Sequence, residues 1–201
     1  MSRNTGPKNR LSRREGLDLF GKGAKLRRGS QPPGQHGPKG LRRASGFGTQ
    51  LREKQKTRRI FDIMERQFRR YFEKARKVPG ATGEVLLRLL ETRLDNVVYR
   101  LGFTATRSQA RQLTSHGHVV VNGRVTNIPS YQVRPGDTVT LDDRSLTNPH
   151  VKARLDDTAQ IQPPAWLARQ AAIGKIERLP KREDINLPIN EQLIVEYYSN
   201  R

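Results

Sequence analysis

The chain has 201 residues, and its 39 lysine and arginine side chains against 19 aspartates and glutamates give a formal net charge of +20. A compact chain with that charge repels itself unless polyanions neutralise it, so the expected partner is nucleic acid. The absence of cysteine excludes disulfides, thiolate-bound metals and thiol nucleophiles. No apolar run approaches the roughly 18 residues of a membrane span, and the first residues lack the apolar stretch of a signal peptide.

Most of the excess charge lies in residues 1–80, which hold 23 basic and 6 acidic side chains, whereas residues 81–201 hold 16 and 13. Residues 1–48 are dense in Gly, Pro, Arg and Lys and cannot bury enough apolar surface to offset the entropy of ordering them. The alternative for these residues is a solvated, disordered basic tail with no bound partner. We predict a basic extension ordered by a polyanion, with a stiff, turn-rich loop at residues 32–38.

The sequence pattern becomes helical from residue 51 onwards. Residues 62–65 match a capping box that starts at Asp62, and apolar residues then recur at helical spacing as far as Ala75. The next helix carries an apolar stripe from Val85 to Leu101, which is the strongest core signal in the chain. The tail at residues 187–198 is too apolar to be free. We expect it to dock against a core as a short helix capped by Asn190.

Residues 91–145 predict a compact unit in which two helices feed a small sheet. The Asn-Gly pair at 122–123, between apolar residues, marks a hairpin, and residues 138–141 follow a turn as a further strand. The second helix opens at residue 106 with a capping-box pattern and ends at residue 117. Residues 142–183 give no clear pattern.

On this second helix, the spacing of the side chains predicts two faces. Ala110 and Leu113 lie three residues apart and are expected to face inward. Arg107 and Arg111 lie four residues apart and are expected to share the opposite face, directed towards solvent or a partner.

The sequence offers no catalytic constellation. His116 and His118 are two possible metal ligands without an obvious third, and imidazoles that bond backbone or phosphate are the simpler interpretation. Asp142 and Asp143 resemble an acid–base pair, but adjacent carboxylates in a turn-rich stretch are more often solvated. Glycine–lysine pairs lack the spacing of a P-loop. We therefore expect that this chain is not an enzyme. Phosphate neutralisation by Arg and Lys, with few aromatics in the extension, favours structured RNA contacted through its backbone and grooves.

A set of short motifs lies in a fixed order along nearly the whole chain. The set comprises Pro-Pro-Gly-Gln-His-Gly at 32–37, Arg-Glu-Lys-Gln-Lys at 52–56, Glu-Arg-Gln-Phe at 65–68, Arg-Leu-Asp-Asn-Val-Val-Tyr-Arg-Leu-Gly-Phe at 93–103, Gln-Ala-Arg-Gln-Leu at 109–113, His-Gly-His at 116–118, Val-Asn-Gly at 121–123, Pro-Ser-Tyr at 129–131, Arg-Pro-Gly-Asp at 134–137 and Asn-Glu-Gln-Leu at 190–193. Each motif alone is weak, but their order and spacing together are specific. With them the chain resembles the family of small-subunit ribosomal protein four, bacterial type.

The resemblance implies an α+β fold in three parts. These are a basic RNA-binding extension (1–48), a small all-α domain (49–90 plus 184–201), and an inserted RNA-binding domain (91–183, core 91–145) of two helices packed on a small, mostly antiparallel sheet. The C-terminal segment is expected to return to the helical domain, which fits the apolar tail.

The resemblance also implies a structural role in the small ribosomal subunit. Family members bind the five-prime domain of small-subunit ribosomal RNA early in assembly and neighbour ribosomal protein five. They line the channel through which messenger RNA enters, where changes alter decoding fidelity, and some repress translation of their own operon's messenger. We expect no membrane partner, no small-molecule substrate, and a ribosome-bound location in the cytoplasm or in an organelle of bacterial descent.

One departure from the family concerns zinc. Many members hold zinc with four cysteines in the extension, the first pair spaced Cys-x-x-Cys, and the matching positions here are Asn9 and Ser12. We therefore expect no metal and no other cofactor. The extension is then expected to be ordered by RNA contacts alone.

Two alternatives belong to other classes of protein. The small RNA-binding domain also occurs in modification enzymes such as pseudouridine synthases, but that interpretation needs a catalytic domain, and the remaining residues are a basic arm and a few helices. A free messenger-binding translational repressor is the second alternative, since one surface can serve both roles.

The residues predicted to contact RNA are basic, and none is predicted to be catalytic. They are Arg3, Lys8, Arg10, Arg13, Arg14 and His36 in the extension, Arg52, Lys54, Lys56, Arg59, Arg69 and Arg70 in the helical domain, and Arg107, Arg111 and His116 in the inserted domain.

Overall fold

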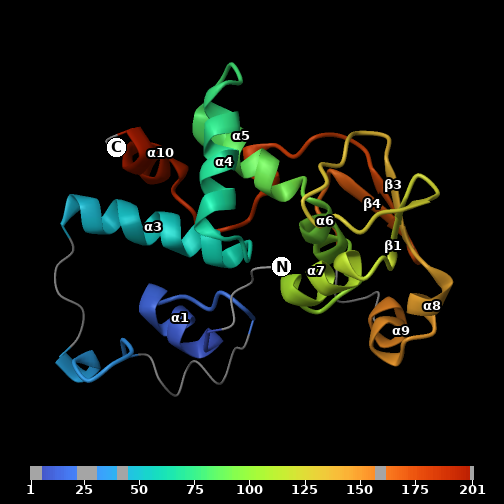
Figure 1. Cartoon of the computed structure of the whole chain (residues 1–201), viewed down its shortest axis with the longest axis horizontal. Helices are drawn as coiled ribbons and strands as arrows, with labels where there is room; N and C mark the ends of the chain where they lie inside the picture. Colours follow the sequence, from blue (N-terminus) through green and yellow to red (C-terminus); the bar gives the residue numbers. More distant parts are fainter. Residues whose placement is uncertain (1–5, 22–30, 40–44, 157–161, 200–201) are drawn as a thin grey trace. The chain divides into compact units, whose positions relative to one another are not determined.

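A computed structural model describes residues 6–21, 31–39, 45–156 and 162–199 of the chain. The chain divides into two compact units (Figure 1): unit 1 comprises Met1–Gly83 with Leu187–Arg201, and unit 2 comprises Glu84–Asn186. The chain therefore leaves unit 1, forms unit 2, and returns. The exact domain boundaries given above stay a prediction.

Unit 1 is helical in its described residues. Its elements are α1 (Lys8–Glu15), the 3-10 turn η1 (Gly37–Lys39), α3 (Gly46–Ile60), α4 (Glu65–Arg76), the first residues of α5 (Thr82–Glu91) and α10 (Glu191–Ser199). The predicted capping box at residue 62 is wrong. Asp62 lies in the turn between α3 and α4 with φ of 52°, a left-handed conformation that Asp tolerates, and Met64 is the residue that precedes α4.

The C-terminal helix α10 packs against α3 and α4, as the apolar tail predicted (Figure 1). Tyr198 stacks on Phe72 with ring centroids 4.5 Å apart, and Tyr197 stacks on Phe47 at 5.6 Å. Asn190 Oδ1 accepts a hydrogen bond from the backbone N–H of Gln192 at 3.1 Å, which confirms the predicted cap. Tyr197 and Phe72 are buried, so these contacts cover the core of unit 1 with a segment more than a hundred residues away in sequence.

Unit 2 is an α+β structure with an antiparallel sheet of five strands in the described residues, in the order β2-β1-β3-β5-β4. The strands are β1 (Val119–Val121), β2 (Arg124–Val125), β3 (Thr138–Leu141), β4 (Leu167–Gln170) and β5 (Ile173–Ile176). The helical elements are the rest of α5, α6 (Leu94–Arg100), α7 (Arg107–Ser115), α8 (Asp143–Leu146), α9 (Pro149–Asp156) and the 3-10 turn η3 (Arg182–Asp184). The two-helix-on-sheet prediction is confirmed, and β1, β2 and β3 lie where the sequence placed strands.

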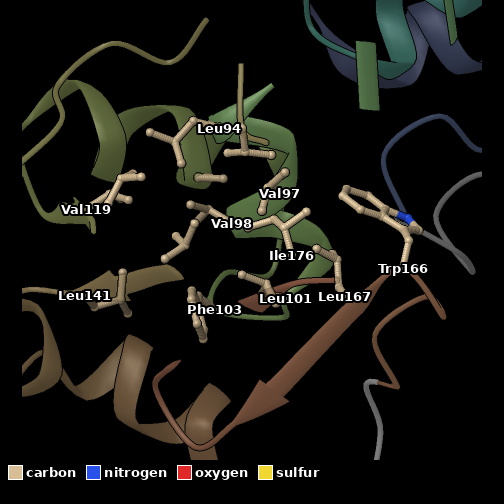
Figure 2. Close-up of a cluster of buried hydrophobic side chains, with 14 of the residues drawn as sticks. Leu94, Val97, Val98, Leu101, Phe103, Val119, Leu141, Trp166, Leu167 and Ile176 are labelled. Atoms are coloured by element: carbon tan, nitrogen blue, oxygen red, sulfur yellow. The ribbon is translucent and has the colours of Figure 1, made fainter. Parts of the chain in front are cut away.

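The core of unit 2 lies between α6 and the sheet (Figure 2). Leu94, Val97 and Val98 of α6 and Leu101 at its C-cap are fully buried. Figure 2 shows Trp166 at one side of this cluster, beside the strand that follows it, and its side chain is 1% exposed. Residues 142–183, which gave no clear pattern, thus supply α8, α9, the β4–β5 hairpin and one of the largest core side chains.

The apolar stripe from Val85 to Leu101 forms two helices rather than one. The chain breaks between α5 and α6 because Arg93 adopts an extended backbone and pairs with Gln132 as an isolated β-bridge. The Thr92 hydroxyl donates to the Arg88 carbonyl at 2.8 Å and stabilises the break.

Candidate RNA-binding surface

The solvent face of α4 is the most basic surface on any described element. One side of the helix is buried and apolar, and the opposite side carries the basic side chains. The buried residues are Phe68, Tyr71, Phe72 and Ala75. Exposed cations on that side are Arg66, Arg69, Arg70, Lys74 and Arg76, followed by Lys77 at the C-cap.

A single exposed acid, Glu73, lies on this face of α4, and it contacts Arg69 at 3.2 Å. Arg69 and Arg76 also border a surface hollow of about 450 Å³, together with Glu65 and Tyr198. The two predicted contacts Arg69 and Arg70 therefore differ: Arg69 already has a carboxylate partner, whereas no acid within the described residues pairs with Arg70 by an ion-pair contact.

Arg66, Lys74 and Lys77 were missing from the predicted set. The signal was present in the sequence, because these three residues share the helical spacing of Arg70, at four, four and seven residues.

Lys54 is held inside unit 1 rather than presented to solvent. Its Nζ donates to Glu65 Oε1 at 2.8 Å and lies 4.6 Å from the centroid of the Tyr197 ring. Tyr198 donates to the same carboxylate oxygen at 2.8 Å. Burial acts to raise the pKa of Glu65, but the hydrogen bonds from Lys54 and Tyr198 outweigh it and lower that pKa. A direct RNA contact by Lys54 needs this cluster to open.

Arg52 and Arg59 of α3 converge on Glu15, the last residue of α1. Glu15 Oε1 accepts from Arg52 Nη1 at 3.1 Å and from Arg59 Nη1. Burial raises the pKa of Glu15 and lowers that of Arg59, although the opposite charges counteract both shifts. The expectation that RNA contacts alone order the extension is therefore wrong, because α1 is tied to α3 within the protein. Lys56, next along α3, pairs with Glu53 at 2.7 Å.

Within the extension, the predicted residues divide into internal and external groups. Arg13 donates to the backbone carbonyl of Gln31 at 2.8 Å, and Lys8 Nζ lies 5.5 Å from the centroid of the Phe20 ring. Arg10 and Arg14 are exposed and lie one turn apart on α1. His36 is exposed beside η1. Arg3 lies outside the described residues.

The expectation for Arg107 is wrong, because its side chain folds inward. Arg107 Nε donates to Asn96 Oδ1 at 2.8 Å, and its guanidinium lies 4.4 Å from the centroid of the Tyr99 ring. The inward face of α7 carries Ala110 and Thr114, both fully buried, and Leu113 is partly buried against the same core, as the spacing predicted. Sequence reasoning missed Thr114 because it is polar; its hydroxyl donates to the Ala110 carbonyl at 2.9 Å and so can be buried.

The rest of the predicted set in unit 2 stays on its surface. Arg111 is half-buried, and its charge acts on Asp95, whereas His116 is exposed at the end of α7. His116 borders a hollow of about 580 Å³ that is also lined by Gln112 and by Arg154 of α9.

A buried polar network fixes the start of α6, where α7 docks. Arg93 is fully buried and binds Asp95 through two hydrogen bonds of 3.0 and 2.7 Å. Glu91 accepts from Asn96 at 2.6 Å and from Arg100 at 2.6 Å. Because a buried charge is tolerated when it is paired and hydrogen-bonded, these residues hold structure rather than meet a ligand.

Neither a metal cluster nor a membrane-spanning helix is found in the part of the chain that the structure describes. Across residues 6–21, 31–39, 45–156 and 162–199, no group of three or more His, Asp or Glu side chains is placed to hold a metal ion. None of the helices in those ranges is long and apolar enough to cross a membrane.

Comparison with known proteins gives matches along the whole chain. The ribosomal protein S4/S9 N-terminal domain matches residues 3–91, and the S4 domain matches residues 92–139. The small ribosomal subunit protein uS4 of Pelotomaculum thermopropionicum is 54% identical over 208 residues, covering 99% of this chain and 100% of the relative. Those of Dictyoglomus turgidum and Thermus thermophilus are 53% and 50% identical over the same lengths and shares.

Proposed function

Because the chain belongs to the small ribosomal subunit protein uS4 family, we propose that its specific target is the five-prime domain of small-subunit ribosomal RNA. Membership of this family makes the chain a small-subunit ribosomal protein that binds RNA, and not an enzyme. We further propose that it binds early in assembly, neighbours ribosomal protein five, and influences decoding fidelity where messenger RNA enters the subunit. Family resemblance supports these finer roles.

The observation that carries the RNA-binding proposal is the cationic face of α4. Arg66, Arg70, Lys74 and Lys77 are exposed, and the one acid exposed beside them is held by Arg69. Phosphates that lie along this face displace counterions and gain charge-assisted hydrogen bonds, without any contact to base edges. A rigid helix that displays cations at fixed spacing suits the shaped backbone of folded RNA.

The test compares two double variants of equal charge on the same helix. R66Q/R70Q removes two cations from the middle of the face, whereas R69Q/R76Q removes two that border the hollow with Glu65 and Glu73. We expect R66Q/R70Q to weaken binding to a five-prime-domain transcript by about tenfold or more, because charge-assisted hydrogen bonds contribute roughly 1.5–3 kcal/mol each. The slope of log affinity against log salt should also flatten by about 1.4–1.8.

The control R69Q/R76Q should change both quantities less. Equal losses for the two pairs, with native melting of both variants, would show that diffuse charge and not this face binds the RNA. Sedimentation of cell lysate separates the ribosomal role from a free messenger-binding repressor, since a ribosomal protein co-migrates with small subunits.

A further inference from the structure

We propose that Glu15 is a positioning residue for RNA binding, which fixes α1 on α3 so that Arg10 and Arg14 meet the RNA in a set geometry. This inference rests on the proposed function, and it gives an acidic residue a positive role in binding a polyanion.

Glu15 is placed as an anchor rather than as a surface charge. Its side chain is 3% exposed, and one carboxylate oxygen accepts from both Arg52 and Arg59. Two guanidinium groups around one carboxylate leave the cluster with a net positive charge. Loss of the carboxylate would therefore leave two partly buried arginines that repel each other. Removal of one partner of a buried ion pair is far more disruptive than its net contribution suggests, because the remaining charge is left uncompensated.

The same short helix organises the described loop of the extension. Arg13 Nε donates to the carbonyl of Gln31 at 2.8 Å, and Arg13 Nη2 to that of Pro32 at 3.4 Å. Ser12 is buried, and its hydroxyl accepts from the backbone N–H of Leu19 at 3.4 Å. An anchor for α1 is thus also an anchor for the described segments that follow it in the chain, around Leu19 and at residues 31–32.

Arg10 and Arg14 point away from the anchored side of α1. Ser12 and Glu15 mark the buried side, and the 3.6-residue period places Arg10 and Arg14 on the opposite one. Both arginines are exposed, and no ion pair within the described residues engages either. They are the cations of α1 most available for phosphate, provided that the helix is held in place.

Charge alone and positioning predict opposite outcomes for one substitution. E15Q raises the formal net charge from +20 to +21, and general attraction to RNA should then strengthen binding. If Glu15 acts by holding α1, E15Q should weaken binding although the protein becomes more basic.

The experiment measures binding of the full chain to a five-prime-domain transcript over a range of salt concentrations. We expect E15Q to bind about tenfold more weakly, with the log–log salt slope reduced by about 1.4–1.8, the equivalent of two phosphate contacts. E73Q is the matched control: it makes the same change of charge at a glutamate that is 57% exposed, and it frees Arg69, so its affinity should equal or exceed that of the wild type. E15Q binding as tightly as E73Q would overturn the proposal.

A mutant cycle tests whether Glu15 acts through the two arginines. R10Q/R14Q should weaken binding in the wild-type background and have little further effect in the E15Q background, since coupled residues are not additive. Additive losses would show that Glu15 does not position them.

Hydrogen exchange on the free wild-type chain keeps the proposal testable if E15Q fails to fold. We expect the amides of α1 to be protected without RNA, because the anchor lies within the protein. Exchange at the rate of an unstructured peptide would overturn the proposal. If the wild type fails to bind the transcript, the proposed function falls, while the exchange experiment still judges the anchor.

Discussion

At the residue scale, Asp184 shows how one carboxylate holds a turn. Asp184 accepts from Arg178 through two hydrogen bonds of 2.6 and 2.7 Å, and from the backbone N–H of Lys181 at 2.8 Å. The hydrogen bonds from Arg178 hold the pKa of Asp184 below its ordinary value of 3.8. Because the folded-state pKa is lowered, the stabilisation is complete above the ordinary pKa and is lost as pH falls through the folded-state pKa.

This linkage gives a prediction for D184N. We expect D184N to melt at a lower temperature than the wild type at pH 5–7. The difference in Tm should shrink as pH falls below 3.8 and through the lower folded-state pKa, where the wild-type carboxylate also becomes neutral. Thermal melting across that range measures it. In an R178Q background the pH-dependent part of the difference should largely vanish. A difference in Tm that stays constant down to pH 2 would contradict the assignment.

The same scale shows what sequence alone could predict about the candidate site. Helical spacing contained the signal for Arg66 beside Arg70, but the composition of residues 1–48 predicted no helix, so it did not group Arg10 with Arg14 on α1. It could not predict that Arg107 lies against Asn96 and Tyr99, because those partners belong to a different helix and spacing describes one helix at a time. Helical spacing also could not distinguish cations that form ion pairs with acids inside the protein, such as Lys54 and Arg59, from cations exposed to bind phosphate.

At the element scale, β5 depends on a glycine that meets a helix. A Cβ built on Gly174 would collide with Leu101 Cδ1 and lie 2.7 Å from Cδ2, so β5 can approach α6 because residue 174 has no side chain. We predict that G174A lowers the free energy of unfolding by about 1–3 kcal/mol through overpacking.

Chemical denaturation measures this effect, and two further variants define its cause. G46A is the control, since nothing lies within 4 Å of a Cβ at that position, and it should be close to neutral. L101V makes room opposite the new methyl group, so G174A/L101V should cost less than the sum of its single changes. A neutral G174A would contradict the close approach.

Element prediction succeeded where periodicity was strong and failed where the tertiary structure decided. The hairpin at Asn122–Gly123 and the docked C-terminal helix follow from turn chemistry and apolar spacing. The strands β4 and β5 carry Arg169, Gln170 and Lys175, so no run of apolar residues marked them as strands. The break between α5 and α6 depends on the pairing of Arg93 with Gln132, which is almost forty residues away and invisible to a local pattern.

At the scale of the whole molecule, unit 2 interrupts unit 1 between two nearby points of the chain. A Cβ on Gly83 would lie 2.8 Å from Glu191 Cβ, so the residue before unit 2 touches the helix that follows it. A closed insertion point of this kind is where domain insertion is best tolerated, because the outer domain keeps its own core. We infer that unit 1 can form without unit 2.

Replacement of residues 84–186 by a flexible linker of about six residues tests this independence, since such a linker reaches up to roughly 20 Å. We expect the shortened chain to keep helical circular dichroism, cooperative melting and the near-ultraviolet signal of its tyrosines, because Tyr197 and Tyr198 of α10 pack on rings of α3 and α4. The control, residues 1–83 without residues 187–201, should lose cooperativity because that packing is absent. Because the shortened chain retains the cations of α4, it should still bind RNA with a steep salt dependence. Gradual melting of the shortened chain, with no near-ultraviolet signal, would mean that unit 1 folds only with unit 2 in place.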